Sequence, residues 1–150
     1  MEVQSQGEVG AMLVKVKRVV GWALFFYGIL YAMQVLFNRL YADAFSPQHV
    51  YDVMNYCTAV GIAISIAVVS AHKRRVGSSD DSPAGRFLAA QAGFYMTMAL
   101  ALLYFPLWFS LLFGDTVTDV QNVGWILVSA INPLVLGTTG SFLWKSVRGQ

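Results

Sequence analysis

The sequence predicts an all-α integral membrane protein whose four transmembrane helices form an antiparallel bundle, with both the N-terminus and the C-terminus in the cytoplasm. Hydrophobic residues make up 57% of the 150 residues and charged residues only 12%, about half the charged fraction of a typical soluble domain. Four apolar runs follow one another, over residues 19–37, 53–71, 87–113 and 120–144. Each is close to or above the ~20 residues that cross the hydrocarbon of a bilayer. We therefore expect residues 1–150 to be a single four-helix transmembrane domain.

The first helix is predicted over roughly residues 15–40. Basic residues precede its apolar run and the segment Ala42-Asp43-Ala44 loosely resembles a cleavage site, as in a signal peptide. The apolar run is too long for the core of such a peptide, so we interpret it as a retained transmembrane helix. Residues 1–12 show no sustained period and predict a flexible tail.

The second and third helices are predicted over roughly 47–73 and 83–113. Ser46 and Ser82 are each followed by proline, a pattern typical of a helix N-cap and first helical position. The polar, glycine- and serine-rich residues 74–84 between them indicate a flexible cytoplasmic loop. The third helix is long enough that it must tilt, bend at Pro106 or project beyond the bilayer.

The fourth helix, roughly 119–146, contains Asn132 and Pro133 near its middle. The proline removes a backbone donor and leaves a carbonyl near Ser129 without its usual partner. Broken helices at the midplane are common transporter binding sites, but polar groups at depth are also common packing contacts. Both readings, a substrate site and a packing bend, stay open.

The charges predict the orientation of the helices. Segments at the two ends and between the second and third helices hold every basic residue except Arg39, and the positive-inside rule places them in the cytoplasm: Lys15, Lys17, Arg18, Lys73, Arg74, Arg75, Arg86, Lys145 and Arg148. With this topology, Trp22 and Trp144 lie at the inner interface and Trp108 and Trp125 near the outer one, as expected for indole rings.

The types of residue present disfavour several functions. All 8 acidic residues lie in tails, loops or helix ends, whereas ion-driven machines need a titratable group at membrane depth. No nucleophile set, phosphate loop or haem-ligand pair is found, and Cys57 has no basic neighbour. The net charge of +2 is too small to indicate nucleic acid. We expect no cofactor and consider an enzyme acting alone improbable.

Two charged clusters are weaker candidates for binding. His49 and Asp52 share one helix face, and Asp43, Asp115 or Asp119 could approach them, which makes a conceivable metal site. Two adjacent ligands fall short of a closed site, so an interfacial helix start is the alternative. Lys73, Arg74 and Arg75 form a basic cluster that predicts contact with anionic lipid headgroups or with a partner protein.

Uncharged polar and small residues occur within the apolar runs. Gln34 and Asn55 both fall in the outer third of their helices and could meet, so they join Ser129, Asn132 and Pro133 as a possible substrate or packing site. Small residues repeat every four positions on three helices, and the first helix looks bulky nearly all round. The smooth faces are predicted at Ala59, Ala63 and Ala67; at Gly93, Thr97 and Ala101; and at Ser129, Pro133 and Gly137.

Two functions are compatible with these features. The first is a non-catalytic subunit or assembly factor of a larger membrane complex, which predicts other membrane subunits as partners besides the bilayer and its anionic lipids. The alternative is a small transporter or channel for a neutral or lipid-like substrate, working as an oligomer with its site at the break in the fourth helix. In both cases the expected location is the bacterial inner membrane or an equivalent membrane.

Overall fold

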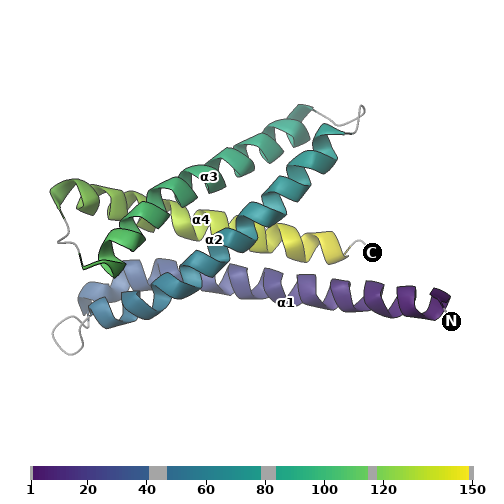
Figure 1. Cartoon of the computed structure of the whole chain (residues 1–150), viewed down its shortest axis with the longest axis horizontal. Coiled ribbons are helices and arrows are strands. Elements are labelled where there is room, and N and C mark those ends of the chain that lie inside the picture. Colours follow the sequence, from purple (N-terminus) through teal and green to yellow (C-terminus); the bar gives the residue numbers. More distant parts are fainter. Residues whose placement is uncertain (1, 41–46, 79–83, 115–117, 149–150) are drawn as a thin grey trace.

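The computed structural model describes residues 2–40, 47–78, 84–114 and 118–148. It is all-helical, with α1 over Glu2–Phe37, a short 3-10 turn η1 over Asn38–Leu40, α2 over Pro47–Gly77, α3 over Ala84–Leu112 and α4 over Asp119–Arg148 (Figure 1). All four α-helices contain a segment that is long and apolar enough to cross a membrane. The prediction of four apolar helices in a multi-pass membrane protein is therefore supported.

The helix bounds differ from the sequence prediction mainly at two ends. The helix α1 begins at Glu2, whereas residues 1–12 were expected to be a flexible tail. Extending a helix that already exists needs no new nucleus, so a segment without a hydrophobic period can still continue it. The helix α2 begins at Pro47, as predicted, but runs to Gly77 into the expected loop 74–84. Ser46, Ser82 and Pro83 lie outside the described residues.

The first and last helices form the most extensive helix pair, and α2 packs mainly on α3. Figure 1 shows α1 and α4 side by side, with α2 crossing them at an angle. Gly21 lies against Gly140 and Trp144, and Gly28 lies against Pro133 and Gly137. Position numbers rise along α1 as they fall along α4, so these two helices run in opposite directions along their shared seam.

Glycines set how closely α1 and α4 approach. A Cβ atom at Gly140 would lie 2.6 Å from the backbone oxygen of Gly21 and 2.6 Å from the nitrogen of Phe25. A Cβ atom at Gly28 would lie 3.1 Å from the Pro133 oxygen. Small residues allow this backbone contact because membrane helices associate chiefly through close packing. The first helix looks bulky in the sequence, but its tightest interface is formed by its glycines.

The core lies where α2, α3 and α4 meet, and a smaller cluster joins α1 to α4. The larger cluster is formed by Ile62, Leu100, Ala101, Tyr104, Val128 and Val135, and the smaller one by Leu24, Leu136 and Leu143. On the outside, large apolar side chains such as Leu36, Val53, Leu102 and Ile126 are exposed on every helix. This outward apolar surface suits a lipid solvent, where an exposed leucine carries no penalty.

Two tyrosines link α2 to α1 and α3 by hydrogen bonds. Tyr27 of α1 donates a 2.6 Å hydrogen bond to the carbonyl oxygen of Met54, and its hydroxyl lies 2.9 Å from that of Thr58. Tyr104 of α3 donates a 2.6 Å hydrogen bond to the carbonyl oxygen of Asn55. Because water is scarce at this depth, such bonds between helices fix the position of α2 along its axis.

The predicted small-residue face of α2 meets the core at one of its three positions. Ala59 is half-buried and packs against the core, and Ala63 and Ala67 are exposed, while Thr58, Ile62 and Ser65 are fully buried. The prediction was therefore wrong for Ala63 and Ala67, because the side of α2 turned toward the core is the one that carries Thr58, Ile62 and Ser65. In α3, the predicted Thr97 and Ala101 are buried.

Candidate functional site

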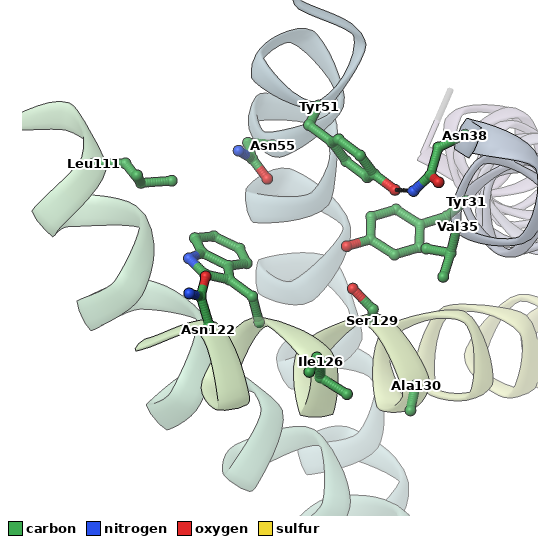
Figure 2. A pocket seen from close by; sticks show the side chains of 11 residues that line it. Tyr31, Val35, Asn38, Tyr51, Asn55, Leu111, Asn122, Ile126, Ser129 and Ala130 are labelled. Carbon is green, nitrogen blue, oxygen red and sulfur yellow. Dashed lines mark hydrogen bonds between the residues drawn. The ribbon is translucent and has the colours of Figure 1, made fainter. Parts of the chain in front are cut away.

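A cavity of about 850 Å³ opens among all four helices, at the end of the molecule where α1 leads into α2 and α3 into α4 (Figure 2). Its volume is within the range of small-molecule sites, which are roughly 300–1,000 Å³. The lining comes from α1 and η1 (Tyr31, Val35 and Asn38), α2 (Tyr51 and Asn55), α3 (Leu111) and α4 (Asn122, Trp125, Ile126, Ser129 and Ala130).

The polar groups of the cavity face one another from different elements. The Nδ2 atom of Asn38 donates to the Tyr51 hydroxyl over 2.9 Å, which joins η1 to α2. Figure 2 shows the hydroxyl of Tyr31, from α1, pointing toward that of Ser129, from α4. Figure 2 shows the amides of Asn55 and Asn122 around the same space. The amide and hydroxyl groups offer both donors and acceptors to a bound molecule.

The described part of the lining carries no charge. None of the lining residues that the structure describes is acidic or basic, and about half are apolar: Val35, Leu111, Trp125, Ile126 and Ala130. An ion in this space would lose hydration without meeting an opposite charge, which is costly. An uncharged molecule with an apolar body and one or two polar groups matches both the apolar and the polar lining residues.

Tyr104 supports the cavity wall from the core side. Its ring packs edge-on against Trp125 with centroids 6.1 Å apart, and its hydroxyl bonds the Asn55 backbone. Tyr104 is fully buried, so the wall rests on the packed core of α2, α3 and α4. Two lining residues from different helices are thus positioned by one buried side chain.

The residues predicted from sequence for a substrate or packing site separate in the structure. Asn55 and Ser129 line the cavity, whereas Asn132, Pro133 and Gln34 are not among its lining residues. Asn132 is fully buried, and both amide atoms lack a hydrogen-bond partner within the described chain. Pro133 faces a groove between α1 and α4. The Nε2 atom of Gln34 is buried and also unpartnered.

Sequence reasoning missed four polar residues of the cavity. Tyr31, Asn38, Tyr51 and Asn122 lie near helix ends, where polar side chains usually indicate only the membrane interface. The signal that would have found them is their shared depth, since all four fall within a few turns of one predicted membrane surface. Uncharged polar residues that lie at the same predicted depth on different helices form such a set.

The charged candidates are not among the described residues that line the cavity. His49 and Asp52 are exposed near the start of α2, and no group of three possible metal ligands occurs in the described residues. Asp43 and Asp115 lie outside those residues. Lys73 and Arg74 line a separate pocket between α2 and α3, and Arg75 is exposed beside it without lining it.

Comparison with known proteins adds no assignment. No family model, curated protein sequence or solved structure matches this chain. The function is therefore argued from the cavity itself.

Proposed function

We propose that the protein is a small membrane transporter or channel for a neutral, lipid-like molecule, working as an oligomer, and that the cavity is its binding site. The observation that carries the proposal is a cavity lined by all four helices, whose described polar residues, from α1, η1, α2 and α4, are uncharged. Convergent polar groups in an otherwise apolar pocket are the usual features of a small-molecule site. The proposed site therefore lies nearer the N-terminal end of α4, at Asn122 and Ser129, than the site expected at the Pro133 break.

The lining indicates which molecule would bind. Val35, Leu111 and Ile126 offer an apolar wall to an alkyl or ring body. Asn55, Asn122 and Ser129 would pair with a hydroxyl, ether or amide group. A long-chain alcohol or a monoacylglycerol meets both requirements, whereas a fatty-acid anion brings a charge that none of the described lining residues neutralises.

The proposed orientation is an antiparallel bundle in a bacterial inner membrane or equivalent, with both termini inside and the cavity facing out. Basic residues at the opposite end of the molecule support it. The tryptophans support it as well: the rings of Trp22 and Trp144 lie 4.7 Å apart, while Trp108 and Trp125 both contact Tyr104. One pair of indole rings near each end of the bundle is what the inner and outer membrane interfaces predict.

Flux across liposomes containing the full chain tests the proposal. Ser129→Phe fills the cavity and Asn122→Leu removes a polar contact, so both are expected to reduce transfer of a fluorescent monoacylglycerol. Thr138→Val is the matched control, since this exposed α4 residue bonds only carbonyls of its own helix. Transfer that is unchanged in folded Ser129→Phe protein would contradict the proposal.

A second candidate, a non-catalytic subunit of a larger membrane complex, is favoured by a groove on the outer side of α1 and α4. It encloses about 770 Å³ and includes Gly28, Ala32, Ala130, Gly137 and Ser141. Small residues of this kind allow a helix of another subunit to approach closely. Purification in mild detergent tests it: a partner should copurify in fixed stoichiometry and be lost in Gly137→Leu. Recovery only as a monomer or homodimer would count against it.

A further inference from the structure

A further pocket lies between the end of α2 and the start of α3. Figure 1 shows these helix ends at the opposite end of the molecule from the start of α2 and the end of α3, where the cavity lies. It encloses about 590 Å³ and combines two cations, three uncharged polar residues and two phenylalanines: Lys73, Arg74, Ser70, Ser78, Gln91, Phe87 and Phe94. Its composition is unlike that of the cavity, because it is basic and edged by rings. It therefore suits a different ligand.

Both cations line this pocket, and no ion pair links either of them to a carboxylate among the described residues, which do not include Asp80 and Asp81. The Nζ atom of Lys73 lies 4.0 Å from the centroid of the Phe94 ring and 4.9 Å from that of Tyr95. These rings orient the ammonium group but do not neutralise it. Arg74 lines the same pocket, and two positive charges in one partly enclosed space repel each other. An anion bound between them removes that repulsion.

Gln91 supplies a second, independent indication. Its Oε1 atom is buried and has no hydrogen-bond partner in the described structure, and a buried acceptor without a donor is unfavourable. The two ends of an amide are exchanged by a simple flip. A hydroxyl group both donates and accepts, so a ligand hydroxyl satisfies Gln91 in either orientation.

The phenylalanines indicate that the ligand has an apolar part. Phe87 is 45% exposed at the edge of the pocket, and α3 is one of the helices that can span the bilayer. An acyl chain can run along this ring while its headgroup enters between α2 and α3. Basic pockets between membrane helices are known to take anionic lipid headgroups.

We propose that the pocket formed by Lys73, Arg74 and Gln91 binds a phosphodiester whose headgroup carries a free hydroxyl, with phosphatidylglycerol as the lipid that fits. Lys73 and Arg74 contact the phosphate, and Gln91 contacts the headgroup hydroxyl. Soluble glycerol phosphate, a phosphate monoester with free hydroxyls, offers the same two kinds of contact but lacks the acyl chains that Phe87 would contact. The site is separate from the cavity, so this inference does not depend on the proposed transport function.

Native mass spectrometry of the full chain with added lipids tests the site. Phosphatidylglycerol is expected to remain bound about tenfold more than phosphatidylcholine, a difference that one charge-assisted contact provides. Excess glycerol phosphate should not displace it. Equal retention of the two lipids would overturn the proposal, and displacement by glycerol phosphate would overturn its lipid part.

Two variants separate a pocket from general surface charge. Arg74→Gln is expected to lower phosphatidylglycerol retention about tenfold, whereas Arg75→Gln, which removes the same charge one residue outside the pocket, should have little effect. Equal losses in both would show nonspecific attraction and overturn the site. Gln91→Leu should abolish the preference for phosphatidylglycerol over phosphatidic acid, which has no headgroup hydroxyl. An unchanged preference in folded Gln91→Leu protein would overturn the hydroxyl contact.

Discussion

Tyr104 and Asn55 are joined by a hydrogen bond of 2.6 Å from the tyrosine hydroxyl to the asparagine backbone carbonyl. The bond links α3 to α2 directly behind the cavity, since the Asn55 side chain is part of the lining. One buried hydroxyl therefore contributes both to the packing of the bundle and to the shape of the candidate site.

Tyr104→Phe is expected to lower the free energy of unfolding by about 0.5–1.5 kcal/mol, the net value of one such bond. Thermal unfolding in detergent would measure the loss. Tyr95→Phe is the control, because Tyr95 lies on the same helix but is 61% exposed. Equal stability of Tyr104→Phe and the unmodified protein would mean that the bond adds nothing to the fold.

Gly140→Ala is expected to destabilise the α1–α4 pair by about 1–3 kcal/mol, because overpacking forces the backbones apart. The new methyl group would lie 2.6 Å from backbone atoms of Gly21 and Phe25, which cannot rotate away. Gly137→Ala is the matched control one turn away, since no atom lies within 4 Å of a Cβ placed there. If both variants unfold at the same temperature, the close approach is not a determinant of stability.

Asn132→Leu is expected to stabilise the protein by about 1–3 kcal/mol, since it removes a buried amide with no recorded partner. Leucine has a similar volume and suits the apolar residues around the fourth helix. Thermal unfolding of the variant would be compared with that of Thr97→Val, whose hydroxyl bonds its own helix at Gly93. A marked loss of stability in Asn132→Leu would instead reveal a partner for the amide, such as a buried water.

Trp125 provides an optical test of the cavity, because it is the tryptophan among the lining residues. A monoacylglycerol with a nitroxide-labelled chain is expected to quench fluorescence of the protein in a saturable manner. Trp125→Phe should remove most of the saturable part, whereas Trp22→Phe at the opposite end should retain it. Identical quenching curves for the two variants would place the ligand outside the cavity.

Cysteine labelling tests the proposed orientation. On a Cys57→Ala background, Ser78→Cys is expected to react with a membrane-impermeant maleimide only after the cytoplasmic side is exposed. Thr118→Cys, which follows α3 at the other end, should react from outside in intact cells. The reverse pattern would invert the topology and place the cavity on the cytoplasmic side.

The fold class could be predicted because length and hydropathy decide whether a helix can cross a bilayer. Residue contacts between helices depend on rotation about each helix axis, which composition does not specify. Ala59, Ala63 and Ala67 had the spacing of an interface, yet only Ala59 packs against the core, and Thr58, Ile62 and Ser65 are the buried residues. Conversely, Gly21 and Gly28 were hidden among bulky neighbours on a helix whose other faces are exposed.

The candidate site could be predicted only in part for a related reason. Ser129 and Asn55 were identified because polar residues inside apolar runs are conspicuous. Asn132 was equally conspicuous, but it faces the core and does not line the cavity. Asn38 and Asn122 escaped attention because helix ends are normally polar. A cavity formed by four elements exists only after they are brought together, and no single segment encodes it.

The pairing of the first helix with the last has a consequence for how the protein is made. While α2 and α3 are being synthesised, the glycine face of α1 around Gly21 and Gly28 has no permanent neighbour, because its partner residues lie in α4. The nascent protein therefore holds its tightest seam open until α4 has been made. A ribosome that stops before α4 releases a chain whose first helix presents its glycine face to other membrane helices.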